Sequence, residues 1–224
     1  MGLLVVKLLP RKLLIKTGPV DHADWNYRPF LAKISRVRFS LVRSMLDGES
    51  CSRLLELGYG SGVFLPELAL HTRQLYGADI HRHSGVVSRR LAALNLHAEL
   101  HTCDTRALPF PEAFFQCVVA VSVLEFVDDL SAACREIKRV LTPDGILVVA
   151  TPRISPILDV GLRLLTGESA KHDFSARREQ VIPTLKKYFV VAEERTAGLL
   201  SLKLYTGLKL CPLPQVQTPQ IAAA

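Results

Sequence analysis

The sequence predicts a single α/β domain around a doubly wound, mostly parallel sheet of seven strands. Short apolar strands alternate with helical stretches between residues 53 and 151, and this alternation is typical of a parallel sheet covered by helices on both faces. The segment 117–123, CVVAVSV, is continuously apolar, as expected for a strand buried on both faces. Two strand-like segments, 188–198 and 201–210, follow closely enough to form a terminal antiparallel pair.

Length, composition and charge limit the class of protein. The 224 residues, 49% of them hydrophobic, suffice for one domain with a full core. The five scattered cysteines form no C-x-x-C pair and no zinc spacing, which favours a reducing cytoplasm and no disulfides. Of the net charge of +7, residues 1–50 carry +5, from nine Lys/Arg against four Asp/Glu. Such asymmetry indicates an anionic partner, either a membrane surface or nucleic acid.

The first 50 residues are expected to form a basic, aromatic cap segment and a helix. The apolar start, 1–16, is broken by Pro10 and is too short to span a bilayer, so we expect an early strand or a segment lying on the surface. From Tyr27 to Met45, apolar residues recur every three or four positions, which predicts a helix ending near Asp47. The basic residues of this helix are expected largely on its other faces: Arg28, Lys33, Arg36, Arg38 and Arg43.

The core elements follow in order along the chain. The expected strands are 53–58, 74–80, 98–104, 117–123 and 146–151. The expected helices are 63–73, 84–95, 128–141 and 175–187, with a turn at 142–145. An apolar insertion at 154–166 precedes the last helix, and the Pro/Gln/Ala tail at 212–224 is expected to be disordered.

Polar side chains stand at the predicted ends of four successive strands. They are Glu56, Asp79, Asp104 and Ser122. Ligands of doubly wound sheets bind outside the carboxyl ends of the strands. The convergence of these four residues therefore predicts a ligand site at that edge.

The first strand runs into a glycine turn, Gly58-x-Gly60-x-Gly62. The dinucleotide fingerprint needs its third glycine at position 63, where this chain has Val63. A ligand without a phosphate at this point requires only close backbone approach, and the carboxylate of Glu56 would favour a cationic ligand over a pyrophosphate. A purely structural turn is the alternative. Asp79 suits the hydroxyls of a ribose in either a nicotinamide or an S-adenosylmethionine site, and Asp104 suits the amino group of adenine or, alternatively, a surface ion pair.

The segments LLELGYGSG, YGADI, CDTRALPFPEAFFQCVVAVSVLEFVDD and LTPDGILVVATP resemble the successive motifs of class I S-adenosylmethionine-dependent methyltransferases, close to the type 11 group. The resemblance covers residues 51–152 and implies a Rossmann-like methyltransferase domain over 51–211. It implies that Glu56 and the glycines line the methionine part of S-adenosyl-L-methionine, and that Tyr59 either contacts the cofactor or packs. It implies the remaining cofactor contacts at Asp79 and Ile80 (ribose), Asp104 and Thr105 (adenine), and Ser122 (sulfonium).

The resemblance implies methyl transfer by in-line displacement to a small-molecule or lipid-like acceptor. Related quinone O-methyltransferases carry a Glu-His pair where this chain has Glu125-Phe126, so a metal-assisted O-methylation is not expected. Candidate catalytic residues are His22 and Tyr27 in the cap segment, and Glu125. The alternatives are packing of the cap around Trp25 and a carboxylate that merely starts a helix.

The sequence also bears on other partners and functions. His81 and His83 lack a third ligand, so no metal site is predicted. The chain lacks an N/D-P-P-Y/F-like signature after the fourth strand, which disfavours an RNA or protein substrate despite the basic helix. A non-catalytic S-adenosylmethionine-binding protein and an NAD-dependent oxidoreductase are further alternatives. The apolar 154–166 segment and the basic N-terminus are compatible with peripheral membrane contact, but core packing in a monomer or dimerisation is the favoured explanation of the same residues.

Overall fold

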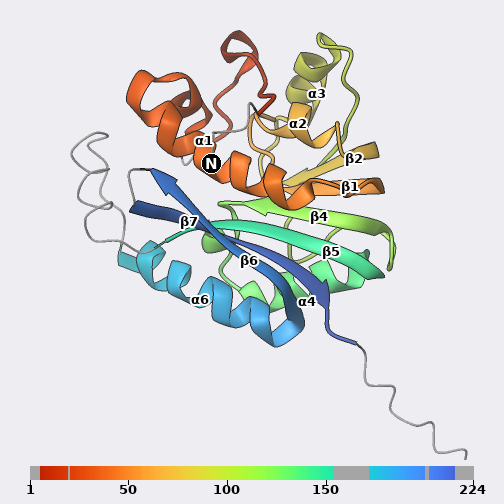
Figure 1. Ribbon diagram of the computed structural model, residues 1–224. Coiled ribbons are helices and arrows are strands. Elements are labelled where there is room, and N and C mark those ends of the chain that lie inside the picture. Colours follow the sequence, from red (N-terminus) through yellow and green to blue (C-terminus); the bar gives the residue numbers. More distant parts are fainter. Residues whose placement is uncertain (1–5, 20, 154–171, 200–201, 215–224) are drawn as a thin grey trace, which may run out of the picture.

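The computed structural model describes residues 6–19, 21–153, 172–199 and 202–214. In this part of the chain one seven-stranded sheet runs in the order β3-β2-β1-β4-β5-β7-β6 (Figure 1). The strands are β1 (Cys51–Leu57), β2 (Thr72–Asp79), β3 (Glu99–Thr102), β4 (Phe115–Val121), β5 (Leu141–Pro152), β6 (Phe189–Leu199) and β7 (Leu202–Pro212).

The sheet has the predicted mixture of strand directions. Strands β1 to β5 pair in parallel, and the strand order reverses between β1 and β4, which places a topological switch point there. Strand β7 is antiparallel to both β5 and β6. The predicted α/β, doubly wound, mostly parallel seven-stranded sheet with a terminal antiparallel pair is therefore confirmed.

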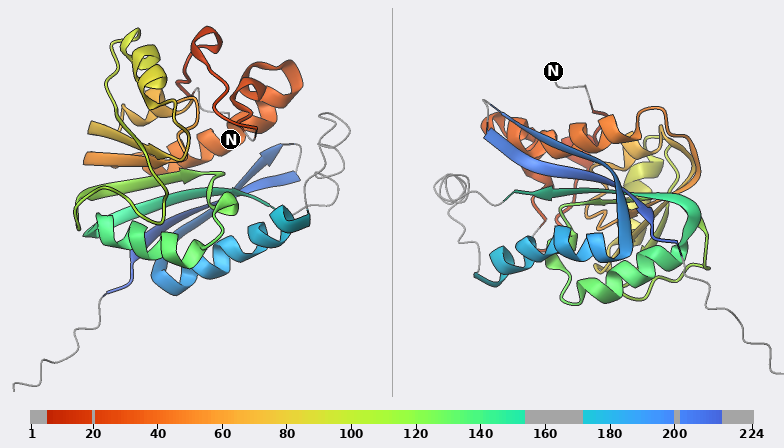
Figure 2. Two further views of the ribbon diagram at one scale, coloured as in Figure 1. Left: turned by 180° about the vertical axis from the view of Figure 1, so that it is seen from behind. Right: turned by 60° about the horizontal axis from the view of Figure 1, so that its bottom comes forward.

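Helices cover both faces of the sheet. Figure 1 shows α1 (Pro29–Leu46), α2 (Leu65–Leu68) and α3 (Ser84–Ala92) on one face, and α4 (Leu130–Val140) and α6 (His172–Tyr188) on the other. The same division is seen from behind in Figure 2. Along β5, Val148 packs in the cluster beneath α1 while Leu147 and Val149 pack in the cluster against α4 and α6. Alternate residues of this strand are thus buried on opposite faces, which explains its continuous apolar sequence.

The N-terminal segment packs beside the glycine turn. It contains two short 3₁₀ helices, η1 (Arg11–Leu13) and η2 (Ala23–Tyr27), and no strand in residues 6–19, so the expected early strand is wrong. The backbone N–H of Leu9 donates to the carbonyl of Val63 at 3.0 Å, and that of Lys7 donates to the buried carboxylate of Glu67 at 2.6 Å. These bonds fasten the segment to the residues that follow β1.

Two sequence-based boundaries differ from the structure. The helix expected over 63–73 is only α2, four residues long, because Pro66 starts it and the chain has already entered β2 at Thr72. Residues 142–145, expected as a turn, lie within β5 instead. Here the pairing of β5 with β4 shifts its register between Phe115 and Cys117. The apolar 154–166 segment and most of the tail after Pro212 lie outside the described residues.

Candidate functional site

The site lies at the carboxyl ends of β1, β2 and β4. After β1, Gly58 turns the chain with φ +68°, and its N–H donates to the carbonyl of Ala78 at the end of β2, at 2.8 Å. A Cβ atom on Gly58 would lie 2.3 Å from the side chain of Val123, which follows β4. Glycine is therefore required here, because the turn and the end of β4 meet at this point.

Asp79, at the end of β2, holds the glycine turn. Its Oδ2 accepts the backbone N–H of Gly60 at 2.8 Å, and its Oδ1 accepts that of His81 at 3.3 Å. The Nε2 of His81 lies 2.8 Å from the carbonyl of Gly60. The sequence suggested only a surface histidine at position 81. The one local feature that could have indicated a site residue is its place two positions after Asp79, the acid that ends β2. The structure therefore adds His81 to the site.

Tyr59 and Ile80 differ sharply in exposure. The side chain of Tyr59 is 2% exposed and packs against Gly77 and the ring of His81, whose centroid is 4.9 Å away. The side chain of Tyr59 therefore packs under the site, and its contact with the cofactor stays a prediction. Ile80 is 75% exposed beside Asp79 and offers an apolar surface to a flat ligand.

Asp104 and Thr105 follow β3. Both oxygens of Asp104 accept from the guanidinium of Arg106, at 2.9 and 2.6 Å, and these bonds lower the pKa of Asp104. The ion pair that the sequence offered as an alternative is therefore present. The Oδ2 of Asp104 accepts one bond, from the guanidinium of Arg106, and has a second lone pair that could accept from an adenine amino group. Thr105 is partly buried next to this pair.

Glu56 is the most strongly perturbed acid of the site. Its side chain, near the end of β1, is 3% exposed, and its Oε2 has no hydrogen-bond partner among the described residues. Burial and the charge of Asp79 raise the pKa of Glu56 to about 8, opposed by the charge of Arg38. A buried, unsatisfied carboxyl of this kind suits a ligand that brings a positive charge or hydrogen-bond donors.

Ser122 lies directly after β4 in a left-handed conformation. Its φ is +52°, its N–H donates to the carbonyl of Ala150 at 2.8 Å, and its Oγ is buried without a partner in the described part of the chain. A non-glycine residue in this region is strained, and such strain concentrates at functional sites.

Glu125 begins the part of the site beyond β4. It lies in the 3₁₀ helix η3 (Leu124–Phe126), is 1% exposed, and its Oε2 has no partner among the described residues. Burial raises its pKa to about 7, opposed by the charges of Arg38 and Arg178. Burial also raises the pKa of Tyr205, and the charges of Arg38, Glu125 and Arg178 act on its hydroxyl.

The sequence did not indicate Arg38, Arg178 or Tyr205. Arg38 was expected on an outer face of α1, but it is partly buried and its charge acts on both Glu56 and Glu125. Arg178 and Tyr205 lie far from Glu125 in sequence and reach it only through the packing of α6 and β7. No local sequence pattern marks them.

The cap segment covers the glycine turn. Asp21 accepts from the backbone and hydroxyl of Thr17, at 3.1 and 2.8 Å, and a Cβ on Gly60 would lie 3.9 Å from both Asp21 and Thr17. His22 stacks on Trp25 with ring centroids 4.3 Å apart. The hydroxyl of Tyr27 donates to the carbonyl of Leu9, and burial raises its pKa. Tyr27 thus fastens η2 to the stretch of chain just before η1.

The described residues show neither a metal-ligand cluster nor a membrane-spanning helix. No group of three or more His, Cys, Asp or Glu side chains within them is placed to hold a metal ion. None of the helices in the described part of the chain has both the length and the apolar character needed to cross a bilayer.

Comparison with known proteins places this architecture in a class. Residues 55–149 match the methyltransferase domain family. The chain is 31% identical over 101 residues to the malonyl-[acyl-carrier protein] O-methyltransferase of Halorhodospira halophila, covering 44% of this chain and 34% of that one. It is 27% identical over 184 residues to the demethylmenaquinone methyltransferase of Roseiflexus castenholzii, covering 71% and 77%.

A solved structure confirms the fold along most of the chain. The N-methyltransferase NodS of Bradyrhizobium japonicum, in complex with S-adenosyl-L-homocysteine, superposes with a TM-score of 0.63 at 21% identity, covering 89% of this chain and 95% of that one. The first six curated relatives are matched over only 27% to 60% of their own lengths.

The sheet order and the superposition on the NodS structure show the class I methyltransferase fold. Residues 55–149 match the model of the methyltransferase domain family, in agreement with the resemblance seen in the sequence.

Proposed function

We propose that this chain is an S-adenosyl-L-methionine-dependent methyltransferase that transfers a methyl group to a small-molecule or lipid-like acceptor by in-line displacement. We propose residues 51–211 as the methyltransferase domain and residues 1–50 as a cap over its site. The observation that carries the proposal is the buried, unsatisfied carboxyl of Glu56 beside a left-handed glycine turn that Asp79 holds in place.

The residues of the site fit this cofactor. Glu56 would accept the methionine ammonium group, Asp79 and Ile80 would contact the ribose and adenine, and Asp104 and Thr105 would border the adenine. The backbone of the turn from Gly58 to Gly62 would approach the methionine part. At Gly60 a Cβ atom would make only ordinary van der Waals contact with Asp21 and Thr17 of the cap. Ser122, whose buried Oγ has no partner in the described part of the chain, would face the sulfonium region.

When bound, the cofactor supplies an activated methyl group, so the protein has to align the acceptor and exclude water. The cap segment, packed on the glycine turn, provides the exclusion. Glu125, with a pKa raised to about 7, is suited to take a proton from a hydroxyl acceptor near neutral pH. The acceptor atom that receives the methyl group would lie near Ser122, between the cofactor and Glu125.

The small-molecule acceptor is supported by the character of the relatives and by the burial of the site. Relatives with similar domains are named as methyltransferases of quinone precursors and of an acyl-carrier-bound malonyl group. The 1% exposure of Glu125 suits a small acceptor better than a nucleic-acid duplex.

Calorimetric titration tests the cofactor. We expect S-adenosylmethionine and S-adenosylhomocysteine to bind the wild-type protein and NAD not to bind. Asp79→Asn should weaken binding of S-adenosylhomocysteine at least tenfold, about 1.4 kcal/mol, because an amide cannot accept from both ribose hydroxyls. The control Asp144→Asn changes an exposed acid in β5 and should leave the affinity unchanged. Binding of NAD without S-adenosylmethionine would refute the proposal.

A further inference from the structure

A cavity of about 570 Å³ lies between α3 and the amino-terminal ends of β2 and β3. It is on the face of the sheet that α3 covers, near the edge that β3 forms (Figure 1). Its volume falls in the range of ordinary ligand pockets, about 300–1,000 Å³. Arg73, which lines the cavity, and Asp79 of the cofactor site stand at opposite ends of β2, about 20 Å apart at the usual rise per residue. A molecule bound in the cavity therefore occupies a second site.

The floor of the cavity is apolar. Leu75 of β2 is 5% exposed and packs in the cluster that includes Val87 and Leu91 of α3. Leu96 and Ala98, in the segment that joins α3 to β3, also line the cavity and are partly buried against that cluster. An apolar surface of this kind suits the hydrocarbon or aromatic part of a ligand.

Two arginines border the apolar floor. Because side chains alternate along a strand, Arg73 projects from the same face of the sheet as Leu75, toward α3. Arg89 comes from α3 itself. Both side chains are exposed, and neither guanidinium has an ion pair or a hydrogen bond in the part of the chain that the structure describes. The donors of two planar cations are thus available to a carboxylate or a phosphate.

Among the residues that line the cavity, no carboxylate faces the two arginines. Glu99, the one acid of the lining, pairs with Tyr76 across the β2–β3 ladder, and Tyr76 packs in the cluster on the other face of the sheet. There the Oε1 of Glu99 lies 2.8 Å from the Nε2 of His101. Residues 72–98 contain four arginines and a single acid, Asp79, which accepts backbone N–H groups at the far end of β2. The charge of the cavity is therefore positive, and it favours an anion.

From this cavity and its charges we propose that the chain has a second binding site, for a small organic anion, separate from the cofactor site. The phosphate or carboxylate of the anion lies between Arg73 and Arg89, and its apolar part lies on Leu75 and Leu96. Because the cavity is at the amino-terminal end of β2, this anion is not the methyl acceptor. The inference does not depend on the proposed methyltransferase function, since none of the residues that line the cavity belongs to the cofactor site.

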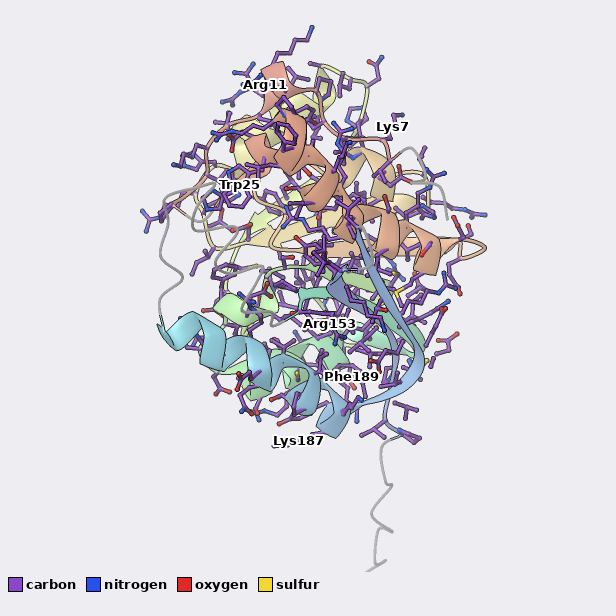
Figure 3. All side chains as sticks on the ribbon, turned by 60° about the vertical axis from the view of Figure 1, so that its left-hand side comes forward. Lys7, Arg11, Trp25, Arg153, Lys187 and Phe189 are labelled. Atoms are coloured by element: carbon purple, nitrogen blue, oxygen red, sulfur yellow. The ribbon has the colours of Figure 1, made fainter. Side chains whose placement is uncertain are left out.

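The test uses the full chain saturated with S-adenosylhomocysteine, which blocks the cofactor site, and follows anion binding by calorimetry. The probes are phenyl phosphate, benzoate, the neutral benzyl alcohol and inorganic phosphate. The first three share an aromatic ring, so differences among them report the head group, and comparison with inorganic phosphate reports the ring. The fluorescence of Trp25, the single tryptophan, reports separately on the cap over the cofactor site (Figure 3).

We expect phenyl phosphate or benzoate to bind at least ten times more tightly than benzyl alcohol, and phenyl phosphate to bind more tightly than inorganic phosphate. Arg73→Gln and Arg89→Gln should each reduce the anion affinity at least tenfold and leave the affinity for S-adenosylhomocysteine unchanged. Because both side chains are exposed, we expect these variants to fold. The matched control Arg90→Gln alters the adjacent arginine of α3, which does not line the cavity, and should have no effect.

Several results would overturn the inference. They are equal or tighter binding of benzyl alcohol, anion binding that survives both Arg73→Gln and Arg89→Gln, and no anion binding up to about 10 mM. A change in Trp25 fluorescence on anion binding would place the anion at the cap and would overturn it too. In all of these cases normal binding of S-adenosylhomocysteine would leave the methyltransferase proposal standing. If S-adenosylhomocysteine fails to bind while anion binding still depends on Arg73 and Arg89, only the methyltransferase proposal is refuted.

Discussion

Gly58 and Val123 lie so close that a Cβ on the glycine would come within 2.3 Å of the valine Cγ2. This contact joins the turn after β1 to the segment after β4, across the switch point of the sheet. The turn after β1 and the segment after β4 can therefore approach this closely only while position 58 has no side chain.

Gly58→Ala should therefore weaken both folding and cofactor binding. The substitution combines a left-handed φ of +68° with the steric clash, and we expect a loss of about 2–4 kcal/mol in unfolding free energy. Two controls separate these causes. Gly48→Ala has a φ of +83° but open space, and should cost only about 1 kcal/mol. Gly18→Ala has neither problem and should be neutral. Urea denaturation measures all three, and equal losses at positions 58 and 48 would contradict the contact argument.

Glu56→Gln should change how stability depends on pH. Because the folded-state pKa of Glu56 is raised from 4.5 to about 8, the folded protein holds a proton that the unfolded chain releases. This contribution is fully present below pH 4.5 and is lost as the pH rises toward 8. We expect the unfolding free energy of Glu56→Gln, relative to wild type, to rise by about 2 kcal/mol or more between about pH 5.5 and 8. Parallel stability profiles for the two proteins would show that Glu56 is not perturbed.

Binding of S-adenosylhomocysteine should release protons near pH 7. An ammonium group beside Glu56 lowers its pKa, so the carboxyl that is mostly protonated in the free protein ionises in the complex. Calorimetry in phosphate and in Tris, whose ionisation enthalpies differ, should detect a release approaching one proton. The release should be much smaller in Glu56→Gln. An equal release in both proteins would remove Glu56 from the ammonium site.

Tyr27→Phe should affect stability alone. The hydroxyl of Tyr27 donates to the carbonyl of Leu9 and so joins η2 to the stretch of chain just before η1. We expect a loss of about 1 kcal/mol in unfolding free energy and an unchanged affinity for S-adenosylhomocysteine. The control Tyr188→Phe removes a hydroxyl with only a 3.4 Å contact to Arg135 and should cost less than about 0.5 kcal/mol. A tenfold weaker affinity in Tyr27→Phe would place Tyr27 in the binding site.

The order of elements and the cofactor side of the site were predictable because their signals are local. A strand is recognised by its own apolar run, and the acid that ends it, such as Glu56 or Asp79, is adjacent in sequence. Since parallel strands end at one edge, adjacency in sequence becomes proximity in space. Element ends were less predictable: α2 is four residues long, and 142–145 stays within β5, because pairing with neighbouring strands overrides local turn preference.

The sequence by itself determined the fold class, and it predicted which acids stand at the strand ends where the cofactor is proposed to bind. Only the tertiary structure decided the acceptor side. The charges of Arg38 in α1 and Arg178 in α6 act on Glu125, and that of Glu125 acts on Tyr205 in β7, although each of the three lies more than fifty residues from Glu125 along the chain. Their proximity depends on how helices pack on opposite faces of the sheet and on the antiparallel return of β7, and no short-range pattern encodes such long-range packing.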